Sequence, residues 1–293
     1  MRIKIVTLLA LSLISFSCSD EDDNQVVVEE PQLIIKFKFD PTQIRLNNIG
    51  QPSTVAAGNA AQSPIFNSIS AHYLEFTPNA LTQVGQGAIL YSGPSTTLGG
   101  ANAIDFSQAK IVGEGEAFLS IPLKNIPQGS YEYVRVSLSY QNYNINVRAS
   151  GSDYVGTLAS FVGYNNYITT HSINGNPFVV NNDVLQGYWA FGIPSVGYYT
   201  SGQAPAGATT VPNPLAATSP IPAGSCLVTG KFVNNFVITG NETKNIEVQL
   251  SLSINNSFEW QEVNADGKFE PSVGENVVDM GLRGLIPSFT ILN

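Results

Sequence analysis

The chain has 293 residues, enough for one large domain or for two smaller ones of roughly 100–200 residues each. It carries 13 Lys and Arg against 22 Asp and Glu, and charged residues make up only 12% of the sequence. This acidic balance argues against nucleic acid as a partner and against electrostatic adsorption to anionic lipid, and it is compatible with divalent cations. The frequent Gly, Pro, Asn, Ser and Thr residues favour a β-protein with many turns and a polar, uncharged surface.

The first segment, residues 1–17, has the composition of a secretory signal peptide. Arg2 and Lys4 precede an apolar run that is too short to form a membrane-spanning helix. The motif at residues 15–18 resembles a bacterial lipobox, which implies that Cys18 is acylated and becomes the first residue of the mature chain. The alternative is ordinary signal cleavage just before this Cys. A stable anchor requires more than one acyl chain, because a single chain binds a membrane only marginally.

Residues 18–31 are predicted to form an acidic, flexible tether. Their acidic run at residues 20–23 resembles the surface-export signal of Bacteroidetes-type lipoproteins. The resemblance implies a protein that is lipid-anchored in the outer membrane and exposed at the cell surface, with a periplasm-facing orientation as the alternative. The membrane is then a partner through the acyl anchor, and a glycan or an envelope protein is the further candidate partner.

The body, residues 32–293, is predicted to be a single large β-domain, with a sub-boundary in the Pro- and Gly-rich stretch 200–222 as an alternative. Apolar and charged residues alternate in residues 32–40, the period of a half-buried strand. The same period of two predicts the clearest strands. They lie at residues 130–140 and 245–258. Shorter strands are predicted at residues 66–76, 87–91, 110–112, 117–123, 143–147, 154–165, 178–180, 185–191 and 226–239.

The connections between these strands are typical of an all-β protein. Asn174-Gly175 is a hairpin signal, and Pro127 and Gly129 are well placed for a turn. The sequence contains no amphipathic helical pattern of about twelve or more residues. It therefore predicts an all-β fold, an antiparallel β-sandwich of immunoglobulin-like or jelly-roll-like type with long loops.

Four segments carry a family resemblance. They are Phe37-Lys38-Phe39-Asp40, Ile69-Ser70, the turn from Pro122 to Tyr131, and Gly187-Tyr188-Trp189. Their order along residues 33–258 is similar to the layout of the methanobactin-associated copper-binding lipoprotein family. The resemblance implies a β-sandwich and, as an alternative function, periplasmic copper binding. It assigns no copper ligand to a particular residue.

Residues 262–270 have the spacing of a calcium-binding loop. With Glu262 as position one, oxygen-bearing side chains fall at positions one, three, five and nine, Gly267 falls at six, and position seven offers its backbone carbonyl. This spacing resembles an EF-hand-type loop with Glu in place of the usual first Asp. Position twelve is apolar, so a later carboxylate would complete the site. The candidate ligands are Glu262, Asn264, Asp266, Lys268, Glu270, Glu275 and Asp279. The alternative is a plain Asp-Gly turn between two strands.

A second candidate site is a set of aromatic residues in the middle of the chain. Tyr164, Tyr167, Tyr188 and Trp189 could form a stacking platform for sugar rings, and the alternative is that they pack at sheet surfaces and core edges. Three further residues with chemical potential are interpreted as structural. They are His72 and His171, which are too far apart in sequence for a recognisable zinc motif, and Cys226, which lies in an apolar stretch and is expected to be a buried thiol.

Two classes of function remain after this survey. The first is a lipid-anchored cell-envelope protein whose β-sandwich has a non-catalytic binding or structural role, with a structural calcium ion as its one candidate cofactor. The second is a surface glycoside hydrolase that uses two carboxylates, for which acidic pairs such as Glu114 and Glu116 are too common in β-proteins to be diagnostic. The absence of sequence motifs for catalysis favours the first class, and no catalytic residue is assigned.

Overall fold

The computed structural model describes residues 30–47, 49–204, 216–280 and 282–293. The predicted signal peptide, Cys18 and nearly all of the tether lie outside these ranges. Inside them the regular secondary structure is almost entirely β, so the expected all-β, sandwich-like fold is confirmed. The helical elements of the described ranges are five 3₁₀ segments, and none is long and apolar enough to cross a membrane. They are η1 (Phe106–Gln108), η2 (Leu123–Asn125), η3 (Pro194–Val196), η4 (Ala216–Thr218) and η5 (Pro271–Val273).

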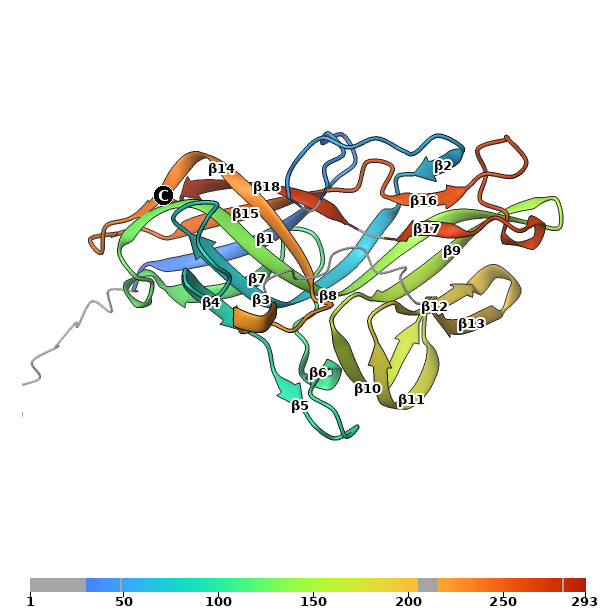
Figure 1. The fold of residues 1–293 in the computed structure, drawn as a ribbon, viewed down its shortest axis with the longest axis horizontal. Coiled ribbons are helices and arrows are strands. Elements are labelled where there is room, and N and C mark those ends of the chain that lie inside the picture. Colours follow the sequence, from blue (N-terminus) through green and yellow to red (C-terminus); the bar gives the residue numbers. More distant parts are fainter. Residues whose placement is uncertain (1–29, 48, 205–215, 281) are drawn as a thin grey trace, which may run out of the picture.

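The largest sheet runs through the middle of the molecule (Figure 1). Its strands, in spatial order, are β13 (Tyr198–Gln203), β12 (Tyr188–Ile193), β9 (Ser152–Phe161), β8 (Gly129–Ala149), β3 (Ile65–Thr77) and β4 (Ala88–Ser92), and β14 (Cys226–Ile238) also pairs with β8. β8 is 21 residues long. It pairs with β14 along its first half, with β9 along its second half, and with β3 on its other side. β8 is therefore the central strand of the large sheet.

Three smaller sheets surround this one. The first contains β18 (Arg283–Ile291), β15 (Ile246–Ser253), β1 (Gln32–Asp40) and β7 (Ala117–Pro122). The second contains β11 (Asn176–Leu185), β10 (Asn165–Ile173), β6 (Ala103–Asp105) and β5 (Ser95–Thr96). The third contains β17 (Val277–Met280), β16 (Phe258–Gln261) and β2 (Asn59–Gln62). Pairing is antiparallel except for β1 with β15 and β6 with β10, which are parallel.

Each smaller sheet supplies side chains to an apolar cluster shared with the large sheet. The main cluster joins β1 and β15 to the first half of β8, through residues such as Phe37 and Val136. A second cluster joins β16 to the second half of β8, through Phe258 and Tyr143. A third cluster includes Ile168 of β10. β8 therefore contributes to all three clusters.

A β-bulge at Ser139 explains how one strand can face two different sheets. Leu138 pairs with Ala71 and Tyr140 pairs with Ser70, so Ser139 is an extra residue in the ladder. A bulge shifts the alternation of side chains by one residue. The apolar residues that face the two neighbouring clusters are consequently even-numbered from Val134 to Leu138 and odd-numbered from Tyr143 to Val147.

Most of the longer predicted strands are present. Residues 32–40, 66–76, 87–91, 117–123 and 226–239 correspond closely to β1, β3, β4, β7 and β14, and residues 130–140 lie in the first part of β8. The Asn174-Gly175 turn is confirmed, since both residues have positive φ, of 49° and 81°, as a type I′ hairpin requires. Cys226 is buried as expected.

Several boundaries differ from the prediction. The separate strands at 130–140 and 143–147 are one strand, β8, because the bulge shifts the alternation without ending the pairing. The predicted strand at 154–165 ends at Phe161, and the one at 185–191 is divided by a turn at Gly187, whose φ is 87°. Residues 245–258 form β15 and the start of β16. Of residues 110–112, only Val112 joins a ladder, through an isolated bridge to Ile69.

Candidate functional site

A cavity of about 980 Å³ lies between the large sheet and the small β16–β17 sheet, near the upper limit of the roughly 300–1,000 Å³ that is usual for ligand sites. One wall consists of β8, β9, β12 and β13, and the other consists of β16, β17 and residues 269–276. Both walls are mainly apolar. The apolar lining includes Tyr154, Trp189, Phe191 and Tyr198 on one wall and Phe258, Phe269, Val277 and Met280 on the other.

The strand register explains why the sheet wall is apolar. Phe191 of β12 lies opposite Leu158 of β9 and Thr200 of β13, and residues opposite one another across a ladder point to the same face. The same rule places Trp189 beside Ser160. Without the bulge in β8, the polar residues that alternate with its apolar ones would face the cavity instead.

Two glycines give the aromatic rings of this wall their positions. A Cβ atom on Gly202 would lie 2.7 Å from the ring of Trp189, and one on Gly156 would lie 2.3 Å from the ring of Phe191. These are distances that no Cβ tolerates, so each ring lies against a bare strand backbone. The absence of a Cβ at these two positions allows each ring to lie close to the strand backbone.

The opposite wall depends on the loop 262–275. Its Phe269 packs 5.1 Å from Phe258 and 5.6 Å from Trp260, measured between ring centroids. The carbonyl of Phe269 also accepts a hydrogen bond of 2.8 Å from the backbone N–H of Arg148 on β8. The loop therefore connects the two walls at this end of the cavity.

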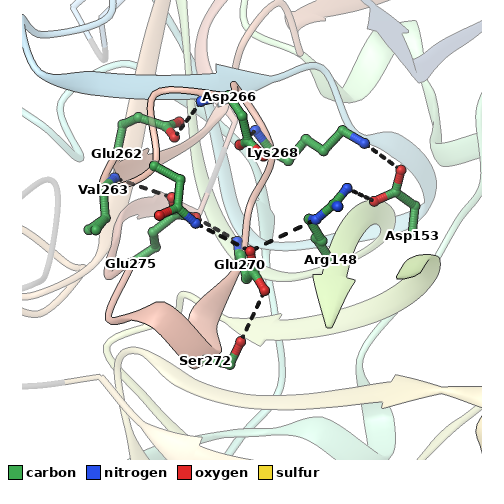
Figure 2. A network of polar contacts seen from close by, with 10 residues as sticks. Arg148, Asp153, Glu262, Val263, Asp266, Lys268, Glu270, Ser272 and Glu275 are labelled. Atoms are coloured by element: carbon green, nitrogen blue, oxygen red, sulfur yellow. Dashed lines mark hydrogen bonds and ion pairs between the residues drawn. The ribbon is translucent and has the colours of Figure 1, made fainter. Parts of the chain in front are cut away.

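Buried Glu275 fixes the conformation of that loop (Figure 2). Its two carboxylate oxygens accept hydrogen bonds from the backbone N–H groups of Val263, at 3.2 Å, and Glu270, at 2.5 Å. Glu262 likewise accepts from the backbone N–H of Asp266, at 3.2 Å. These carboxylates accept hydrogen bonds from backbone N–H groups of their own loop, as they would in a turn that holds no metal ion.

The other predicted metal ligands have different partners. Asp266 accepts from the backbone N–H of Lys268 at 3.0 Å, and Lys268 Nζ lies 2.6 Å from Asp153 on β9. Asn264 donates to Glu270 at 3.3 Å. Asp279 lies on β17, where its carboxylate is 3.6 Å from the buried guanidinium of Arg45.

The calcium site stays a prediction. Among the described residues, no three or more His, Cys, Asp or Glu side chains form a group that could hold a metal ion. His72 and His171 lie on different strands, β3 and β10, and burial lowers their pKa to about 3 and about 4 respectively. The ring of His171 stacks on Phe178 at 5.0 Å, in keeping with a structural role.

The four aromatic residues of the predicted platform do not share one surface. Tyr188 and Trp189 are consecutive on β12 and point to opposite faces, Tyr188 toward Phe161 and Trp189 into the cavity. Tyr164 packs edge-on against His72, and Tyr167 donates a hydrogen bond to Asn181. Of the four, Trp189 alone lines the cavity.

The cavity itself was not anticipated from the sequence. Its walls come from strands as far apart in the sequence as β8 and β17, and β13 and β17 were not predicted as strands. The available signal was the alternation of Trp189, Phe191 and Ile193, which predicts one apolar face without showing what covers it.

Comparison of this chain with protein family models, with curated proteins and with solved structures finds no match.

Proposed function

We propose that the protein is a lipid-anchored component of the cell envelope, displayed on the outer membrane, that binds an apolar ligand without catalysing a reaction. The observation that carries the proposal is the cavity of about 980 Å³ between the two sheets. A soluble β-domain normally fills the space between its sheets with side chains, so a large apolar space bordered by aromatic rings favours binding.

The carboxylates of the cavity support a binding role over acid–base catalysis. Glu275 has both oxygens engaged by backbone N–H groups, and Asp279 lies beside the guanidinium of Arg45. A general acid or base needs a carboxylate that can reach a substrate and exchange its proton there. Both acids instead hold the wall of the cavity in place.

The proposal is tested by titrating the purified protein with the apolar dye 1-N-phenylnaphthylamine, whose fluorescence rises in an apolar environment. Thr200→Trp places a large ring in the cavity from the β13 wall, and we expect at least tenfold weaker dye binding. Val237→Trp is the matched control, because Val237 lies on β14, is 51% exposed and does not line the cavity. Its dye binding should equal that of the unaltered protein.

Melting curves of both variants establish that they fold. The proposal fails if the unaltered protein binds no dye, or if folded Thr200→Trp and the unaltered protein bind it equally well.

A further inference from the structure

The cavity is bordered by the outer edges of two sheets. Among the described residues, β13 is the last strand of the large sheet, and β17 is the last strand of the three-stranded sheet. The lining residues run along both edges, from Val196 to Ala204 on one side and from Asn276 to Met280 on the other. An edge strand presents N–H and C=O groups that can pair with another chain.

β13 lacks the features by which proteins usually prevent such pairing. Its residues are Tyr198-Tyr199-Thr200-Ser201-Gly202-Gln203, with no proline and no charged side chain. Three other edge strands, β7, β11 and β18, contain Pro122, Pro177 and Pro287 respectively. Proline and charge are the common protection of an exposed edge. The edge strands β2, β4 and β5 also lack both, but of these unprotected edges in the described residues it is β13 that lines the cavity.

We propose that the ligand of the cavity is an extended peptide segment that pairs with the edge of β13. This inference rests on the proposed function. Backbone hydrogen bonds to β13 would hold the segment, and every second side chain would enter the space between the sheets. A segment of about six residues is roughly 20 Å long, the length of β13 itself.

Charge on the border of the cavity specifies the segment further. The loop 262–275 and the adjoining turn of β8 and β9 carry more carboxylates than cations (Figure 2). The acids are Asp153, Glu262, Asp266, Glu270 and Glu275, and the cations are Arg148 and Lys268. Both cations already contact Asp153, at 3.1 Å and 2.6 Å. The segment should therefore have alternating apolar residues and a basic residue at the end that lies over this loop.

The probe is a fluorescent eight-residue peptide in which Lys is followed by Leu alternating with a polar residue, and binding is followed by fluorescence anisotropy. Two variants of this peptide carry N-methyl groups on every second backbone amide. One variant is methylated on the odd-numbered amides and the other on the even-numbered amides. Since alternate N–H groups of a strand point to opposite sides, at least one variant should bind at least tenfold more weakly. A third variant has the same composition with all Leu consecutive, and it should also bind at least tenfold more weakly. A fourth variant, the parent peptide with Glu in place of Lys, should bind more weakly than the parent.

Folded Thr200→Trp should lose the parent peptide, and Val237→Trp should retain it. Equal binding of the parent and both N-methylated variants would overturn the inference, because strand pairing would then contribute nothing. Dye binding without binding of the parent peptide would also overturn it while leaving the proposed function intact. Failure to bind the dye at all would remove the proposed function and this inference together.

Discussion

Individual buried polar residues determine where the loops of this protein lie. Glu275 is 3% exposed and joins two backbone N–H groups that are seven residues apart in sequence, those of Val263 and Glu270. Glu75, which is fully buried, does the same for the backbone N–H groups of Gly85 and Gly87. A buried donor that loses its acceptor costs about 1–3 kcal/mol, so such residues are sensitive positions for stability.

Substitution of Glu275 should destabilise the protein. In Glu275→Ala two backbone N–H groups lose their acceptor, and we expect the free energy of unfolding to fall by about 2–4 kcal/mol. Urea unfolding followed by circular dichroism measures the change. Glu114→Ala is the matched control, since Glu114 is exposed, and its effect should stay within about 0.5 kcal/mol. Equal midpoints for the two variants would contradict the assigned role of Glu275.

The buried histidines make stability depend on pH. The folded-state pKa of His171, about 4, lies below the value near 6.5 that is typical of an unfolded chain. Between these values the unfolded chain binds a proton that the folded protein does not, so stability is full above about pH 6.5 and is lost as the pH falls toward 4. The groups packed on His171 are the rings of Phe161, Phe178 and Tyr188, none of which is charged in this range.

His171→Phe should therefore reduce the loss of stability between about pH 7.5 and pH 5, leaving the part due to His72. Urea unfolding at the two pH values measures it. Glu259 and Asp153 have lowered pKa values, so they contribute to folding stability while they are ionised. This contribution is lost only when the carboxylates protonate, which happens below this pH interval. An unchanged difference between the two pH values in the variant would show that His171 is not responsible.

At the scale of elements, the sequence predicts strands well where alternation is long and uninterrupted. β1 and the first half of β8 are examples. It predicts them poorly where a bulge changes the phase, as at Ser139, or where a strand is as short as β17, with four residues. The cavity depends on both of these features, and so the strands could largely be predicted while the site could not.

The hairpin between β10 and β11 provides a direct test at this scale. Gly175 has a φ of 81° and no atom near the position of an added Cβ, so Gly175→Ala would add backbone strain and no steric clash. We expect a loss of about 1 kcal/mol in the free energy of unfolding. Gly129→Ala, at a position without positive φ, is the control and should be near neutral. If Gly175→Ala left the free energy of unfolding unchanged, an added side chain would not strain this turn.

At the scale of the whole molecule, the start of β1 and the strands that line the cavity lie at opposite ends of the described chain. β1 begins the described chain at the left of Figure 1, while β12, β13, β16 and β17 occupy the right. A peptide that binds at β13 therefore approaches the molecule at the end opposite the start of β1.

The anchor is tested by expressing Cys18→Ser in the native cell and separating membrane and soluble fractions. We expect the unaltered protein in the outer-membrane fraction and the variant in the soluble fraction, since no other segment is proposed to hold the protein there. Ser17→Ala is a control that keeps the Cys. Retention of Cys18→Ser in the membrane would refute acylation as the means of attachment.

The length of β8 also bears on how the molecule unfolds. Val136, Tyr140 and Tyr143 place one continuous strand in the three largest apolar clusters of the described residues. Separating that strand from its neighbours at either end would expose parts of more than one cluster, and so we expect a single cooperative transition. Occupation of the cavity at one end would consequently stabilise the strands at the other end, where β1 begins, against unfolding.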